Sequence, residues 1–185
     1  NSALRKADQN DEVLRFVEFW KTRTGRLPKE LVFDSKLTTY ANLYRLHQRG
    51  VLFITLRRRS AKLLGQIRQQ PLSVWRRIEL ANLARAYRTP RIIDEVVRLK
   101  DYDHPLRQLT ITDLGHEEPT ILITNQLKRS PADLIGRYAS RMLIENGISE
   151  AIDFFHMDAL SSAVAFKTDC DLQLTLMAYS LYRLL

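Results

Sequence analysis

The feature that most constrains the fold is a strand–helix–strand pattern in residues 31–56. Residues 31–33 form a short apolar run, residues 37–48 carry apolar side chains at helical spacing, and residues 51–56 form a second run rich in β-branched and aromatic side chains. Two such strands joined by a helix are typical of a parallel βαβ unit. We therefore expect an α/β fold whose sheet contains these two strands.

Two further helices are predicted around this unit. Residues 10–24 have the apolar spacing of an amphipathic helix, which Asn10 or Asp11 can cap and Gly25 can end. The basic stretch of residues 60–70 also favours a helix. Both segments fit the helical layers that cover the sheet of an α/β protein.

The second half of the chain changes from alternating polarity to helical patterns. Polar and apolar residues alternate in the stretch 75–127, between turn signals, which predicts antiparallel strands that include residues 120–124. Ser130 is followed by Pro and precedes a pattern that predicts one helix to about residue 146. A last apolar helix is expected in residues 171–185.

The composition and charge of the chain limit the cellular compartment and the class of binding partner that we expect. The 185 residues carry a formal net charge of +8 with a pI of about 9.8, which favours a polyanionic partner. The only cysteine, Cys170, excludes an internal disulfide and a cysteine-based zinc site. No apolar run is long enough to span a bilayer, so we expect a cytoplasmic protein with no membrane partner. The chain begins at Asn1 rather than Met, which we interpret as a fragment or an excised domain.

Asp34 is the first candidate site residue because it follows the apolar run of residues 31–33 directly. Ligands of open α/β sheets bind beyond the carboxyl ends of strands, and a carboxylate there suits Mg²⁺. The alternative is that Asp34 only caps the turn before the next helix.

Tyr138, Arg141 and Glu145 form the second candidate group. Their spacing of three and four places them on one face of the helix predicted from Ser130. One interpretation is an ordinary ion pair between Arg141 and Glu145 within the helix. The other is a metal ligand, Glu145, beside a tyrosine and an arginine that grip a phosphate.

Basic and aromatic residues supply the third group. Arg57, Arg58 and Arg59 follow the strand of residues 51–56, so they should lie at the same sheet edge as Asp34. They are either a solvated charge run or a patch that follows a phosphate backbone. Trp75, which two arginines follow, either stacks on a base or belongs to the core.

Several of these segments resemble the IS4-type DDE transposases. The resemblance is carried by residues 33–36, residues 53–57, Thr124-Asn125 and, above all, the pattern Tyr138-x-x-Arg141-x-x-x-Glu145. It implies a ribonuclease-H-like mixed sheet flanked by helices, with a β-rich insertion between the second and third catalytic acids. Residues 1–59 and 128–185 would form the ribonuclease-H-like domain, and residues 60–127 the insertion.

The resemblance also implies a role for each candidate residue. Asp34 would be the second catalytic acid and Glu145 the third, and both would bind Mg²⁺, with Mn²⁺ as the alternative ion. DNA would be held by Lys36, Arg57, Arg58, Arg59, Trp75, Tyr138 and Arg141. The activity would be metal-dependent cleavage and strand transfer of transposon ends. The partners would be transposon and target DNA, and the resemblance is compatible with a homodimer in the DNA complex.

The chain departs from the family pattern at two places. The position expected for the first catalytic acid falls near Ala3, and the nearby Asp8 and Asp11 have the pattern of a helix start. Ile152 stands where the family usually has a lysine. These departures leave a second interpretation open, a catalytically inactive transposase-derived domain that binds DNA.

Overall fold

The computed structural model describes residues 6–80, 88–115, 117–157, 159 and 164–184. The chain divides into two compact units, which are described one at a time. The first, called here the sheet unit, is Gln9–Ala139. The second, the helical unit, combines Asn1–Asp8 with Ser140–Leu185. The 3-10 helix η1 (Lys6–Asp11) spans the boundary in sequence.

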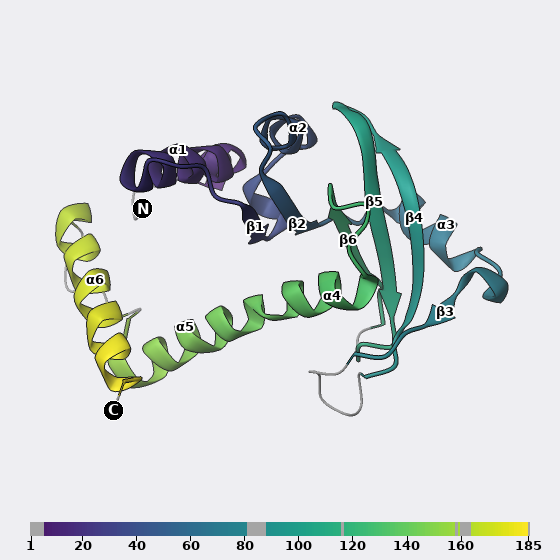
Figure 1. Ribbon diagram of the computed structural model, residues 1–185. Helices are drawn as coiled ribbons and strands as arrows, with labels where there is room; N and C mark the ends of the chain where they lie inside the picture. The colour runs from purple at the N-terminus through teal and green to yellow at the C-terminus, as the bar shows by residue number, and fades with distance from the viewer. Residues whose placement is uncertain (1–5, 81–87, 116, 158, 160–163, 185) are drawn as a thin grey trace. The chain divides into compact units, whose positions relative to one another are not determined.

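The sheet unit is built on one open sheet of six strands in the order β1-β2-β6-β5-β4-β3 (Figure 1). Strands β1 and β2 are parallel, and every other neighbouring pair is antiparallel. This confirms an α/β fold with a mixed sheet. Strands expected in an insertion therefore continue the sheet that β1 and β2 begin. The bounds are β1 (Glu30–Phe33), β2 (Leu52–Leu56), β3 (Arg76–Arg77), β4 (Arg91–Leu99), β5 (Tyr102–Thr112) and β6 (Thr120–Thr124).

In the described part of the sheet unit, four α-helices and two short 3-10 helices accompany the strands, besides the end of η1. Their bounds are α1 (Glu12–Thr24), η2 (Ser35–Leu37), α2 (Tyr40–Gln48), α3 (Ala61–Arg68), η3 (Leu72–Val74) and α4 (Pro131–Ala139). The predicted start of α4 is confirmed, since the Ser130 hydroxyl accepts a hydrogen bond from the Asp133 N–H at 3.1 Å. Gly25 ends α1 in the left-handed conformation, with φ of 72°.

Two helix starts differ from the sequence prediction. The helix expected from residue 37 begins at Tyr40, because the Thr39 hydroxyl accepts from the Asn42 N–H at 3.2 Å and caps it there. Asp11 precedes α1 but makes no side-chain cap. Its carboxylate instead accepts from the Asn42 side chain at 2.7 Å, which ties the start of α1 to α2.

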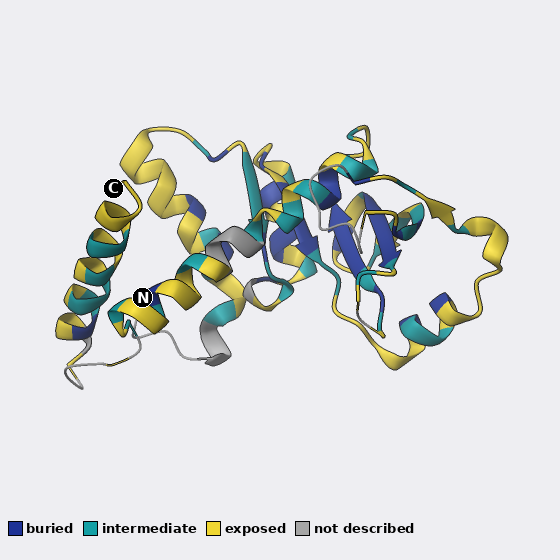
Figure 2. Cartoon of the chain, turned by 90° about the horizontal axis from the view of Figure 1, so that it is seen from below, coloured by how far each residue is buried: buried dark blue, intermediate teal, exposed yellow. Residues whose placement is uncertain are grey.

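Successive residues of each strand point to opposite faces of the sheet. Helices pack against the apolar side chains on both faces. Phe53 packs with Leu43 and Leu46 of α2, whereas its neighbour Ile54 packs with Leu134 of α4 on the other face. Figure 1 shows α1 and α2 on one side of the sheet and α4 on the other. In Figure 2 the buried residues, drawn dark blue, gather on the strands.

The helical unit contains α5 (Arg141–Phe155) and α6 (Ala165–Tyr182). The two helices are joined by the Tyr179 hydroxyl, which donates to the Glu150 carboxylate at 2.8 Å. The expected C-terminal helix thus begins at Ala165, earlier than residue 171. Among the described residues, no helix combines the length and apolarity that a membrane crossing requires.

The prediction of one continuous helix from Ser130 to about residue 146 is wrong. α4 ends at Ala139, α5 begins at Arg141, and Ser140 forms a turn between them. Serine is a weak helix former because its hydroxyl competes for backbone hydrogen bonds. The break separates Tyr138, at the end of α4, from Arg141 and Glu145 in α5.

Candidate functional site

Asp34 follows the last residue of β1 and caps the short helix η2. One of its carboxylate oxygens, Oδ1, accepts from the Lys36 N–H at 3.3 Å and from the Ser35 hydroxyl at 3.1 Å. The side chain is half-buried. The structure therefore confirms the capping role of Asp34, and the same turn holds the carboxylate at the carboxyl end of a strand. The Lys36 side chain is exposed beside it.

Arg58 lies over the Asp34 turn from the neighbouring strand. β1 and β2 run parallel with Phe33 opposite Thr55, so the residues after both strands leave the same sheet edge. The Arg58 guanidinium donates to the Ser35 carbonyl at 3.4 Å and to the Asn10 side chain at 3.3 Å. These two bonds are long, and the Arg58 side chain remains exposed. The Arg58 guanidinium thus contacts the turn that Asp34 caps, through the backbone of Ser35.

The three consecutive arginines do not form one patch. The Arg57 guanidinium donates to the buried Gln108 side chain, and its N–H donates to the Ile121 carbonyl at 2.7 Å. Arg59 is exposed and lines a surface cavity together with Arg57 and Pro119, ahead of β6. Only Arg58 of the three contacts the turn after β1, because successive residues of an extended chain point in alternate directions.

Trp75 packs against α3. Its ring adjoins a small cluster of Leu63 and Ile67 from α3 and Ile121 from β6. The side chain is half-buried, and it also lines a surface cavity of about 240 Å³ with Arg68 and other residues. The packing role is thus confirmed, and the base-stacking role stays a prediction.

Tyr138 and Arg141 belong to different units. Tyr138 packs beneath the sheet against the core cluster that contains Leu134 and Ile135. Arg141 is the first residue of α5. Glu145 lies in the same helix, and its side chain is outside the described part of the structure. The expectation that Asp34 and Glu145 share a metal ion therefore stays a prediction.

The described side chains offer few other metal ligands. Within them, no group of three or more His, Cys, Asp or Glu side chains is placed to hold a metal ion. Ala3, the position expected for the first catalytic acid, lies outside the described residues. Asp34 remains the described carboxylate whose position at a strand end suits a hard oxygen ligand.

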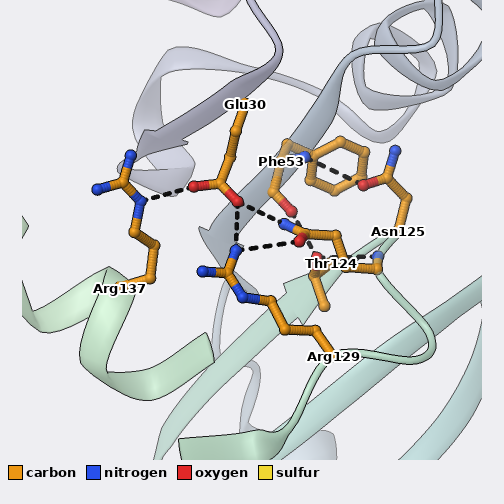
Figure 3. A network of polar contacts seen from close by, with 7 residues as sticks. Glu30, Phe53, Thr124, Asn125, Arg129 and Arg137 are labelled. Carbon is orange, nitrogen blue, oxygen red and sulfur yellow. Dashed lines mark hydrogen bonds and ion pairs between the residues drawn. The ribbon is translucent and has the colours of Figure 1, made fainter. Parts of the chain in front are cut away.

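A polar network around Glu30, at the start of β1, was not predicted from the sequence. Its carboxylate accepts from Arg129 at 2.6 Å, from Arg137 at 2.6 Å and from the Gln126 amide at 3.0 Å, as Figure 3 shows. Burial alone would raise the pKa of Glu30, but the hydrogen bonds from Arg137 and Gln126 and the charge of Arg129 outweigh it and lower the pKa. The partners lie about 100 positions away in sequence, so no local pattern indicates them.

Asn125 is a second residue whose role was missed. Its side chain accepts from the Phe53 N–H at 3.0 Å, as Figure 3 shows, and donates to the Val51 carbonyl, also at 3.0 Å. The Asn125 side chain thus takes the place of a backbone partner beyond the end of β6. This fixes the start of β2, and with it the register that brings Arg58 to the Asp34 turn.

No model of a known protein family matches the chain, and no curated protein matches it significantly.

Proposed function

We propose that this chain is part of a DDE transposase of the IS4 type, with a ribonuclease-H-like arrangement of its sheet and helices. One observation supports this above the others: Asp34 stands at the carboxyl end of β1, and Arg58, from the end of the parallel strand β2, lies over its turn. A carboxylate and an arginine at one sheet edge can serve a cation and a phosphate side by side.

In this function Asp34 and Glu145 are the carboxylates that hold Mg²⁺ or Mn²⁺, and the sharing of one ion rests on the sequence resemblance. Asp34 fits the ion by its chemistry, since a hard carboxylate oxygen at a strand end suits Mg²⁺. The bound metal would supply charge stabilisation and a more acidic attacking oxygen. The Asp34 turn, held by Ser35 and the Lys36 N–H, keeps that carboxylate in one orientation.

The basic residues orient the DNA. Arg58 is the best placed, because its long hydrogen bonds to Asn10 and Ser35 can be exchanged for a phosphate. The reaction would consist of two phosphoryl transfers at this site. The first is hydrolysis at the transposon end, and the second is attack of the freed 3′ hydroxyl on target DNA. Both require the same in-line geometry. The sequence resemblance assigns further DNA contacts to Lys36, Arg57, Arg59, Trp75, Tyr138 and Arg141.

Cleavage of labelled duplex DNA in Mg²⁺ or Mn²⁺ tests this function. We expect the chain to nick DNA and Asp34→Asn to lower the rate about 100-fold or more, because losing only an outer-shell partner of a metal ligand already costs about 10–100-fold. Asp103→Asn is the matched control, since it removes the same charge from an exposed residue of β5. Equal cleavage by Asp34→Asn and the unmodified chain would show that Asp34 has no part in catalysis.

The second candidate function is DNA binding without cleavage. The net charge of +8 and the exposed Arg58 and Arg59 favour it, because phosphate contacts need cations and no metal. This function predicts DNA affinity that falls as salt rises, a weaker affinity for Arg58→Gln, and no effect of Asp34→Asn. An absence of metal-dependent nicking together with that salt dependence would select it.

A further inference from the structure

Helix α1 presents its largest apolar side chains to solvent. The buried residues that hold this helix to the rest of the sheet unit are two small ones, Val13 and Val17. By contrast, Phe16, Phe19 and Trp20 are 44%, 58% and 37% exposed. A surface helix normally turns such side chains toward the core. Exposed apolar side chains that gather in one patch mark a binding surface.

The three rings and Arg23 form one continuous patch, called here the α1 aromatic face. Each of the four residues has a neighbour three or four positions away, so all of them lie on one side of the helix. The ring centroids of Phe16 and Trp20 are 6.1 Å apart, and the Arg23 guanidinium lies 5.8 Å from the centroid of the Phe19 ring. An arginine among exposed rings gives a surface that can stack on flat groups and also attract anions.

Positive charge is concentrated around the α1 aromatic face. Lys21, Arg26 and Lys29 are exposed on the last turn of α1 and in the segment that leads to β1. In the described part of the structure, neither these three side chains nor Arg23 forms an ion pair with a carboxylate. The two carboxylates of α1 are each paired with another arginine. This unbalanced positive charge is complementary to a polyanion.

The chemistry of the exposed apolar side chains distinguishes between polyanions. The exposed large apolar residues of α1 are all aromatic, and none of its large aliphatic side chains is exposed. Insertion into a lipid surface uses aliphatic and aromatic side chains alike. Stacking on a nucleic-acid base requires a ring, and the base must be unpaired so that its flat face is open. Rings beside unpaired cations therefore favour a single strand over a duplex or a membrane.

From these observations we propose that the α1 aromatic face binds single-stranded DNA. Phe19 and Trp20 stack on bases of the strand, and Arg26 and Lys29 contact its phosphates. This binding requires neither the Asp34 turn nor a metal ion, so it holds or fails separately from the transposase function.

Fluorescence anisotropy of a labelled oligo(dT) strand of about 20 nucleotides, measured in EDTA, tests this proposal. We expect Phe19→Ala to weaken binding about fivefold or more, because it removes a ring on which a base stacks. Phe166→Ala is the matched control, since it removes an exposed phenyl ring from α6, and it should change the affinity less than about twofold. The same strand paired with its complement should bind more weakly and should not respond to Phe19→Ala.

Two further substitutions of Phe19 separate base stacking from general apolar contact. Phe19→Tyr keeps the ring and should retain the affinity for oligo(dT) within about twofold, whereas Phe19→Leu should weaken binding as much as Phe19→Ala does. If Phe19→Leu binds as tightly as the unmodified chain, the ring does not stack on a base and the proposal is wrong. A urea midpoint of Phe19→Ala that falls by more than about 0.5 M would also contradict it, because the ring would then pack within the chain.

Salt dependence tests the role of the cations. Replacing both Arg26 and Lys29 by Gln should reduce the slope of log affinity against log salt by about 1.4, because each phosphate contact of a single strand contributes about 0.7. Replacing the exposed Arg98 and Lys100 by Gln removes the same charge outside the α1 aromatic face and should change the slope far less.

Three results would overturn the proposal. The first is that oligo(dT) does not bind, and the second is that the duplex binds as tightly as the single strand, which would assign the contact to phosphates alone. The third uses vesicles of phosphatidylcholine and phosphatidylserine. If Phe19→Ala abolishes binding to these vesicles and leaves the affinity for oligo(dT) unchanged, the α1 aromatic face contacts a membrane surface instead.

Discussion

Replacing Glu30 by Gln removes one charge from the carboxylate that joins β1 to the segment ahead of α4. The glutamine keeps the size of the side chain, and its carbonyl can still accept from one arginine, but its NH₂ group then faces the other. Glu30 is 14% exposed, whereas Arg129 and Arg137 are 34% and 52% exposed. Hydrogen bonds to charged groups contribute about 1.5–3 kcal/mol, and partial exposure of the arginines places these two at the low end. We expect a loss of about 2 kcal/mol in the free energy of unfolding.

Urea denaturation followed by tryptophan fluorescence measures this loss. Both tryptophans of the chain, Trp20 and Trp75, lie in the sheet unit, so their emission reports the unfolding of the unit that contains Glu30. With a slope of about 2 kcal/mol per molar urea, a loss of about 2 kcal/mol lowers the midpoint by about 1 M. Glu18→Gln is the control, because the Glu18 carboxylate is 55% exposed and pairs with Arg49 at the surface.

The pH dependence gives the same network a second test. Because the pKa of Glu30 is lowered in the folded chain, its stabilisation is complete above the unfolded pKa and is lost as the pH falls through the folded pKa. The stability difference between the unmodified chain and Glu30→Gln should therefore be full at pH 7 and shrink below about pH 4. A midpoint shift under about 0.2 M urea at pH 7, or a difference that grows in acid, would contradict the role of Glu30.

Other residues carry predictions of the same kind. Asn125→Ala should cost about 2–3 kcal/mol of stability in urea, because it leaves the buried Phe53 N–H and Val51 carbonyl unpaired; a change under about 0.5 kcal/mol would show that water replaces the side chain. Asp94→Asn should cost about 3 kcal/mol, since Arg107 is 8% exposed and donates to both Asp94 oxygens at 2.8 Å. The hydrogen bond from Arg107 lowers the pKa of Asp94, although burial alone would raise it. The stability lost in Asp94→Asn should therefore be full at pH 7 and shrink below about pH 4. A loss of stability that stays constant down to about pH 2 would disprove the charge pairing.

The strands were predictable where the pattern is local. Residues 31–33, 51–56 and 120–124 are apolar runs bounded by turn signals, and each is a strand of the sheet. The start of α4 was also predictable, because Ser130 followed by proline is a local signal that its hydroxyl bond confirms. The parallel pairing of β1 and β2 followed from the helix between them.

The remaining features depend on contacts between distant residues or on competition between local ones. The spacing of Tyr138 and Arg141 is compatible with one helix, and the break at Ser140 overrides it. The three consecutive arginines after β2 cannot be told apart from the sequence. In the structure the Arg57 guanidinium donates to Gln108 on β5, and these two residues come close together only when the sheet has formed. For the candidate site, the position of Asp34 at a strand end and the arginines at the same sheet edge were predictable, whereas the choice of Arg58 among the three as the one that contacts the Asp34 turn was not.

The most direct test of the transposase function is oxidative cleavage of the polypeptide by Fe²⁺ bound in place of Mg²⁺. With added hydrogen peroxide, bound Fe²⁺ is oxidised to Fe³⁺ while the peroxide is split into hydroxide and a hydroxyl radical, and ascorbate returns the iron to Fe²⁺. The radicals cut the backbone near the iron ligands, and the fragments are identified by mass spectrometry. If Asp34 and Glu145 hold one ion, the chain should be cut near both residues, excess Mg²⁺ should suppress both cuts, and Asp34→Asn should abolish both. Cutting at one position alone, or a cut near Glu145 that survives Asp34→Asn, would contradict a shared metal site.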